Sequence, residues 1–207
     1  MRIAILGAGN VGGGLAAAAV RAGHDVVISA STLESAQNGA AAAASNVDAV
    51  RGADVVVLAV PHGAVAGIAA ELGDALTGAV VVDATNPVND TYTDLVTGGT
   101  SAAEQLQAQL PGASVVKAFN TIFASRHADP TEDGTPLDAF IAGDNTAAKA
   151  KTGELASSLG YHVVDAGGLR MARTLEEMAF LNITLNAANG WPWQSGWKLV
   201  GPTGSAS

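Results

Sequence analysis

The chain has 207 residues, with 10 basic and 19 acidic side chains and a net charge of −9. This acidity, without any basic run, argues against a nucleic-acid partner, because neutralising phosphates requires clustered Lys and Arg. The chain contains no cysteine, which excludes disulfides, thiolate nucleophiles and cysteine-based metal sites.

The length suits one good-sized domain or a domain plus an appendage. Apolar residues make up 48% of the chain but aromatic residues only 4%, which favours close packing of helices on a sheet. The chain opens directly in a strand pattern, without the charged and apolar regions of a signal peptide. No apolar stretch reaches the roughly 18 residues that a membrane span requires. We therefore expect a soluble, cytoplasmic protein with no membrane partner.

The first 20 residues carry the strongest motif. The apolar run Ile3–Leu6 leads into Gly-Ala-Gly-Asn-Val-Gly, and an alanine-rich helical pattern follows. This is G-x-G-x-x-G between a strand and a helix, the context that makes the pattern informative. The first glycine allows the tight turn, the second lets backbone approach a pyrophosphate, and the third lets helix and strand pack closely. The motif predicts dinucleotide binding at Gly7, Gly9, Asn10, Val11 and Gly12.

Strand and helix patterns alternate along the rest of the chain. Further strands are predicted at residues 25–29, 54–60, 79–84, 114–119, 137–142 and 161–165. Helices are predicted at 32–43, 62–76, 101–110, 146–159 and 170–189, with a short helix at 120–124 and loops at 88–100 and 125–136. This order predicts an α/β fold with a doubly wound, mostly parallel, Rossmann-like sheet. We expect a dinucleotide-binding domain at 1–168, a C-terminal helix and Trp-rich segment at 169–200, and a flexible tail at 201–207.

The ends of the predicted strands are the expected ligand site, because open parallel sheets bind ligands beyond their carboxyl ends. The candidate cofactor-binding residues there are Ser29, Ser31, Thr32, Ala59, Val60, Pro61, His62, Asn86, Asn120, Thr121, Ile122 and Ala124. None of these strand ends carries an acid/base pair. His62 is the titratable group there with a pKa near neutral, and it is either a catalytic residue or a solvated residue at a helix start.

The other histidines do not suggest a metal site. His127 and His162 have no Asp or Glu at metal-ligand spacing, so we expect no bound metal. A nucleotide-binding site with few reactive side chains suits hydride transfer, because the cofactor carries the chemistry and the protein only aligns the nicotinamide with a second ring. Asn86 and Asn120 are placed to bond a nicotinamide carboxamide or substrate carbonyl, or simply to cap loops. Ile122 and Ala124 offer small apolar contacts beside a planar ring.

Four segments together resemble a known family. These are MRIAILGAGNVGGGLA, VVVLAVP, VVKAFNTIFA and DAGGLRMARTLE, and they resemble the coenzyme F420-dependent NADP oxidoreductases. The nucleotide-binding module of STEAP-type ferric reductases is a further relative. The likeness runs from Met1 to about Lys198. It implies a nucleotide on the Gly9–Val11 turn and a nicotinamide near Asn120–Ala124. It also implies a cavity above that ring for F420 or a flavin, closed partly by the C-terminal segment.

The segment after the second strand departs from the family pattern. Members of the family carry a Ser-Arg-Arg-like stretch that binds the 2′-phosphate of NADP. The matching residues in this chain are Ala30, Ser31 and Thr32. An acidic residue that would select NAD is also missing at Ser29 and Ala30. We expect NADP(H) to be preferred over NAD(H), through hydroxyl groups and a helix N-terminus at Thr32. The residue that is often His in the F420 enzymes is Asn120 here.

Three functions follow from these patterns. The first is an oxidoreductase that transfers hydride between NADP(H) and F420 or a flavin. The second is an NADPH-dependent reductase of a small carbonyl or imine, with His62 or Tyr92 as proton donor. The third is a non-catalytic NADP-binding sensor or scaffold. A homodimer is also expected, through the apolar residues of the last helix and the tryptophans that follow it, namely Met178, Phe180, Leu181, Ile183, Leu185, Trp191, Trp193 and Trp197.

Overall fold

One eight-stranded sheet forms the centre of the molecule. The structure, a computed structural model, describes residues 1–29 and 39–201. The strands lie in the order β10-β9-β6-β5-β4-β1-β2-β3. Their bounds are β1 (Arg2–Leu6), β2 (Asp25–Ser29), β3 (Ala41–Ala42), β4 (Val55–Leu58), β5 (Val80–Asp83), β6 (Ser114–Lys117), β9 (Asp138–Gly143) and β10 (His162–Gly167). Neighbouring strands are parallel except β6 and β9, which confirms the predicted mostly parallel, doubly wound α/β fold.

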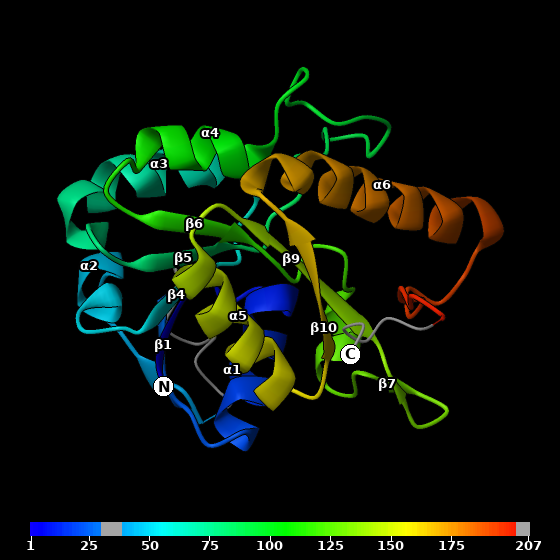
Figure 1. Ribbon diagram of the computed structural model, residues 1–207, viewed down its shortest axis with the longest axis horizontal. Helices are drawn as coiled ribbons and strands as arrows, with labels where there is room; N and C mark the ends of the chain where they lie inside the picture. The colour runs from blue at the N-terminus through cyan, green and yellow to red at the C-terminus, as the bar shows by residue number, and fades with distance from the viewer. Residues whose placement is uncertain (30–38, 202–207) are drawn as a thin grey trace.

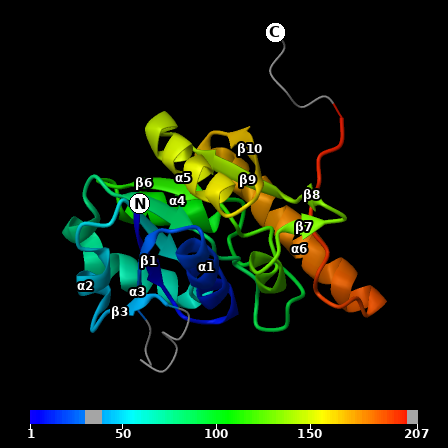
Figure 2. The same cartoon turned by 90° about the horizontal axis from the view of Figure 1, so that it is seen from below.

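Helices cover both faces of this sheet (Figures 1 and 2). One face carries α1 (Asn10–Arg21) and α5 (Thr146–Ser158). The other carries α2 (Asn46–Val50), α3 (His62–Leu72), α4 (Ala102–Gln109) and the start of α6 (Ala172–Asn189). Short 3-10 helices lie at η2 (Gly73–Leu76), η3 (Ala124–His127) and η4 (Leu169–Met171), and β7 (Thr131–Glu132) pairs with β8 (Thr135–Pro136) in a separate hairpin.

Strand residues alternate between two apolar cores. In β1, Ile3 and Ile5 join the core under α1 and α5, whereas Ala4 and Leu6 join the core under α3 and α4. Because both faces are covered, the central strands are largely apolar, which explains the β-branched runs in the sequence. In β5 and β6 the charged exceptions are Asp83, which ends β5, and Lys117, which ends β6.

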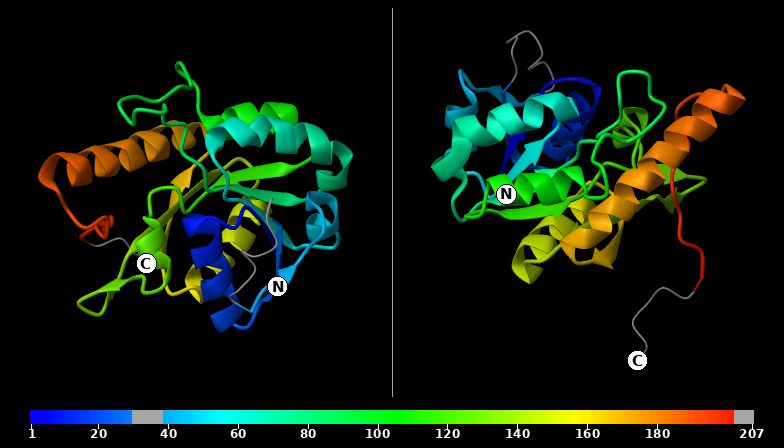
Figure 3. Two further views of the ribbon diagram at one scale, coloured as in Figure 1. Left: turned by 180° about the vertical axis from the view of Figure 1, so that it is seen from behind. Right: turned by 90° about the horizontal axis from the view of Figure 1, so that it is seen from above.

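Helix α6 extends beyond the body of the sheet, as Figure 3 shows. The segment after it returns to the sheet edge, where the backbone N–H of Asp138 donates to the Trp197 carbonyl at 3.0 Å. Lys198 Nζ also lies 2.7 Å from Asp138 Oδ1. These contacts tether the Trp-rich segment to β9. Within residues 1–29 and 39–201, no helix is long and apolar enough to cross a membrane.

Two predicted helices are wrong where the structure describes them. The helix predicted at 32–43 is contradicted at Ala41–Ala42, which pair with Val27 and Ile28 at the sheet edge. The helical preference of alanine is outweighed there by the open hydrogen-bonding groups of β2. Residues 32–38 of that helix, and residues 202–207 of the predicted tail, lie outside the described residues.

The short helix predicted at 120–124 is a turn. Phe119 has a φ of 64°, a left-handed conformation that breaks helical continuation, and the 3-10 helix η3 begins only at Ala124. The predicted loop at 125–136 likewise contains most of η3 and the β7–β8 hairpin. The first difference arises from a tight turn at Phe119 that apolar patterning does not encode.

Candidate functional site

The glycine motif lies at the point where the strand order reverses, between β1 and β4. Gly7 has a φ of 107°, and a Cβ there would lie 2.3 Å from the carbonyl oxygen of Ala59. A Cβ on Gly12 would lie 1.9 Å from the carbonyl oxygen of Gly7. The packing of strand, turn and helix therefore requires these two glycines.

Gly9 is different. Its φ is −70°, and a Cβ there would meet nothing within 4 Å. The fold therefore does not need a glycine at this exposed position. A bare backbone facing open space at the N-terminus of a helix is what close approach of a phosphate needs.

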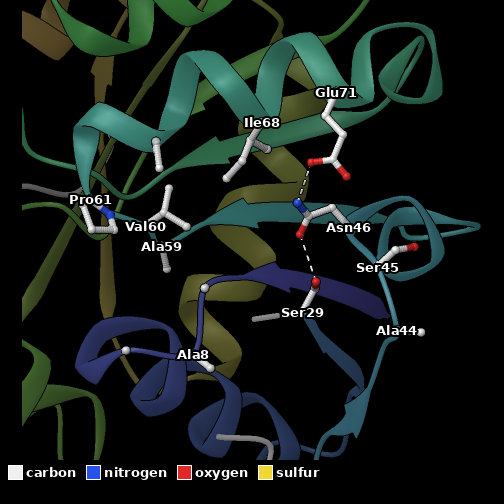
Figure 4. Close-up of a pocket in the computed structure, with 13 residues that line it drawn as sticks. Ala8, Ser29, Ala44, Ser45, Asn46, Ala59, Val60, Pro61, Ile68 and Glu71 are labelled. Carbon is white, nitrogen blue, oxygen red and sulfur yellow. Dashed lines mark hydrogen bonds between the residues drawn. The ribbon is translucent and has the colours of Figure 1, made fainter. Parts of the chain in front are cut away.

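A first pocket of about 530 Å³ opens beside this turn (Figure 4). It is lined by Gly7, Ala8, Gly9, Ser29, Ala44, Ser45, Asn46, Ala59, Val60, Pro61, Ala64, Ile68 and Glu71. Ser29 Oγ donates to Asn46 Oδ1 at 2.9 Å, and Asn46 Nδ2 donates to Glu71 Oε2 at 2.8 Å. One wall is thus apolar and the opposite end is polar.

A second pocket of about 500 Å³ adjoins the first at Pro61. It is lined by Pro61, His62, Gly63, Asn86, Val88, Asn89, Asp90, Tyr92 and Val96. Burial lowers the pKa of His62, against the opposing effect of the nearby Asp83 carboxylate. His62 Nδ1 is buried and has no hydrogen-bond partner in the described part of the chain.

A third pocket of about 510 Å³ lies at Asn10, the first residue of α1. Asn10, Phe123, Ala124, Ser125, Pro192 and Trp193 line it. The Phe123 and Trp193 rings meet edge to face with centroids 5.5 Å apart, and Ser125 Oγ donates to the Trp193 carbonyl at 2.6 Å. The Trp-rich segment thereby becomes one wall of a pocket beside the glycine motif.

The predicted site residues are distributed over these pockets and the protein interior. Gly7, Gly9, Ser29, Ala59, Val60 and Pro61 line the first pocket, Pro61, His62 and Asn86 the second, and Asn10 and Ala124 the third. Val11 packs partly against the core, Gly12 is buried, and Thr121 and Ile122 are buried. Ser31 and Thr32 lie outside the described residues.

The two asparagines proposed for ligand binding contact each other. Asn86 Nδ2 donates to the Asn120 carbonyl at 2.8 Å, and Asn120 Nδ2 donates to Asn86 Oδ1 at 3.0 Å. Asn120 Nδ2 also donates to the Leu175 carbonyl in α6 at 2.9 Å. The pair therefore joins the ends of β5 and β6 to α6, and Asn120 Oδ1 remains buried without a partner in the described residues.

A buried ionic cluster at the ends of β5 and β6 was missed by sequence reasoning. Lys117 Nζ lies 2.9 Å from Asp83 Oδ2, 2.8 Å from Glu176 Oε1 and 2.7 Å from the Thr85 carbonyl. Burial raises the pKa of Glu176, although Lys117 opposes this shift. The sequence feature that could have indicated this cluster is one charged residue inside each of two apolar strand patterns, Asp83 in VVVDA and Lys117 in VVKAF. Asn46 and Glu71 were also missed, because neither follows a predicted strand.

In the described ranges, no group of three or more His, Asp and Glu side chains comes together as a metal site would. The site is a glycine turn at the switch point of a parallel sheet, flanked by pockets along the carboxyl edge. That arrangement is typical of Rossmann-type, nicotinamide-dependent oxidoreductases.

Comparisons with known proteins agree with this class. The family model described as NADP oxidoreductase, coenzyme F420-dependent, matches residues 2–87. An F420-dependent NADP reductase of Methanothermobacter marburgensis is 34% identical, over 91% of this chain and 94% of the relative. Metalloreductase STEAP3 of Rattus norvegicus is 30% identical, over 84% of this chain but only 36% of the relative.

A solved structure extends the likeness to nearly the whole chain. It is the crystal structure of an Arthrobacter sp. FB24 protein named as a candidate F420-dependent NADP reductase. Its identity to this chain is 30% and its TM-score 0.85, covering 97% of this chain and 99% of the other. The chain therefore belongs to the coenzyme F420-dependent NADP oxidoreductase family, and the predicted resemblance is confirmed.

Proposed function

We propose that this protein transfers a hydride between NADP(H) and a deazaflavin, F420, or a flavin. The observation that carries the proposal is Gly9, a glycine that the fold does not need and that faces open space at the N-terminus of α1. The names of the related reductases supply the two redox partners. The proposed place of action is the cytoplasm.

In this proposal the glycine turn, the first pocket and the third pocket each take one part of the ligands. The turn from Gly9 to Val11 holds the pyrophosphate through the unpaired N–H groups of the first helical turn. The first pocket takes the adenosine end. When bound, the nicotinamide supplies the hydride to an acceptor ring that also gains a proton from solvent. Ala124 and Trp193 border the third pocket, where aromatic walls suit a planar acceptor.

The preference for NADP(H) over NAD(H) is part of the proposal. Ser31 and Thr32, the residues expected to receive the 2′-phosphate, lie outside the described residues. The names of the reductases support NADP(H). Parallel titrations with NADPH and NADH test it, and tighter binding of NADH would reject this preference.

The reaction is tested by stopped-flow mixing of the protein with NADPH and oxidised F420 or FMN. Reduction of neither acceptor above a protein-free control would reject it. The Gly9→Ala variant should fold normally, because its Cβ meets nothing, but should lose at least about tenfold in NADPH affinity as the methyl group obstructs the pyrophosphate. Gly153→Ala on the remote helix α5 is the matched control, with ordinary contacts at 3.5 Å or more.

A second function has one observation in its favour. His62 and Tyr92, the two proton donors considered for reduction of a carbonyl or imine, line the same second pocket. In that case His62→Ala should lower turnover of a carbonyl or imine by about 100-fold or more. Tight NADPH binding without reduction of any acceptor would instead indicate the non-catalytic sensor.

We further propose that the C-terminal unit, residues 169–200, forms a homodimer interface. Leu181 and Leu185 are exposed to 48% and 36% on the projecting part of α6, and Trp191 to 44%. Leu181→Glu with Leu185→Glu should convert a dimer to a monomer in light scattering. Ala187→Glu, exposed on another side of α6, is the control. A dimer that survives the double substitution would place the interface elsewhere.

A further inference from the structure

Glu71 brings a carboxylate into the first pocket from a part of the chain with no recognised ligand motif. It lies on α3 with Ala64 and Ile68, which line the same pocket. Figure 4 shows its side chain further along the helix than that of Ile68. Its carboxylate is held by Asn46 at 2.8 Å, and Asn46 is held in turn by the hydroxyl of Ser29 at 2.9 Å. Three elements, β2, α2 and α3, thus fix one polar end of the pocket.

The direction of these hydrogen bonds defines what a ligand must offer. Ser29 donates to Asn46, and Asn46 donates to Glu71, so the chain of donors ends on a carboxylate. An ionised carboxylate only accepts hydrogen bonds. Glu71 is exposed to solvent, and among the described residues it forms no ion pair with Lys or Arg. A ligand group that meets it must therefore be a neutral or cationic donor.

The spacing along α3 places this acceptor at the rim of an apolar wall. Residues 64, 68 and 71 are three to four positions apart, so they follow one face of the helix. Ala64 and Ile68 offer the flat apolar contact that a purine ring needs. Glu71 lies one turn further from the glycine motif, at the outer edge of such a ring.

We propose that Glu71 accepts a hydrogen bond from the exocyclic amine of adenine, and so selects adenine against purines that carry a carbonyl there. This inference rests on the proposed function, which puts the adenosine end of NADP(H) in this pocket. Ser29 ends β2, where the ribose is read in folds of this kind. The whole side chain of Asn46 separates Glu71 from Ser29, which places the carboxylate beyond the ribose and its 2′-phosphate.

The experiment compares NADPH with its hypoxanthine analogue, in which a carbonyl oxygen replaces the amine. Dissociation constants are measured by titration, independently of hydride transfer. The wild-type protein should bind NADPH about tenfold more tightly than the analogue, because carboxylate and carbonyl oxygens repel each other. Glu71→Gln should reduce that ratio to about one, since an amide can donate to the carbonyl. Asp74→Asn, an exposed carboxylate three residues further along and outside the pocket lining, should leave the ratio unchanged.

The outcomes separate this inference from the proposed reaction. An equal ratio in wild type and Glu71→Gln would overturn the role of Glu71. If Glu71→Gln mainly strengthened the binding of NADPH relative to NADH, the role of Glu71 would also be overturned, because that result would show that the carboxylate faces the ribose. Binding of NADPH without reduction of any acceptor would reject the reaction but leave the adenine contact standing. Failure of the wild type to bind either nucleotide would overturn both.

Discussion

Removing the buried amine of Lys117 should destabilise the protein strongly. Its Nζ satisfies two carboxylates, of Asp83 and Glu176, and all three side chains are at most 1% exposed. Replacing one partner of a buried ion pair costs about 3–5 kcal/mol, because the remaining charges stay buried without compensation. We therefore expect Lys117→Met to lower the free energy of unfolding by about that amount, measured by urea denaturation at pH 8.

The loss of unfolding free energy caused by Lys117→Met should depend on pH. Burial already raises the pKa of Glu176, and removing the cation raises it further. The folded variant then binds more protons than its unfolded state, so its stability falls as pH rises. The difference in unfolding free energy between wild type and Lys117→Met should be larger at pH 8 than at pH 5. The double variant Lys117→Met with Glu176→Gln should recover part of the lost stability at pH 8.

Lys151 offers a matched control. It pairs with Asp54 at 3.6 Å, with side chains 40% and 46% exposed. Lys151→Met should change the free energy of unfolding by less than about 1 kcal/mol. A Lys117→Met loss no larger than that of Lys151→Met, or one independent of pH, would refute the reasoning.

Three further predictions concern stability. Gly12→Ala should lower the free energy of unfolding by at least about 1–3 kcal/mol in urea titrations, because its Cβ would lie 1.9 Å from the Gly7 carbonyl oxygen, whereas Gly9→Ala should not. Burial lowers the pKa of His127 to about 4, below the value near 6.5 expected when unfolded. The unfolded state then binds more protons between these values, so stability should fall as pH drops from 6.5 to 4, by on the order of 3 kcal/mol, and His127→Gln should flatten that slope. Ser101→Ala should cost about 1 kcal/mol in thermal or urea unfolding, since Ser101 Oγ caps α4 at the Glu104 N–H, 3.1 Å away; no loss would contradict the cap.

Local sequence patterns predicted the layered fold because their causes lie within a few residues. Apolar runs such as Val55–Leu58 mark strands covered on both faces, and the glycine spacing marks the turn at the end of β1. The segment expected to lie near the nicotinamide, Asn120–Ala124, comes only partly beside that turn. Ala124 shares a pocket with Asn10, while Thr121 and Ile122 are buried.

The last helix shows what local patterns did not reveal. Its apolar residues Leu181 and Leu185 were expected to form a contact face, and they are exposed in this chain. The buried face of α6 includes Glu176, Asn182 and Asn186 as well as apolar residues. A polar residue can be buried when distant parts of the chain supply its partners, as Lys117 does for Glu176. Periodicity cannot indicate such a partner.

The sequence alone predicted every strand of the sheet except β3, most of the helices, the family and the glycine turn, since these depend on spacing within short segments. The tertiary structure decided which side chains share a pocket. It brought Asn46 and Glu71 to Ser29, and Trp193 to Phe123. Those contacts join residues far apart in the chain, and their formation depends on how helices and loops pack around the sheet.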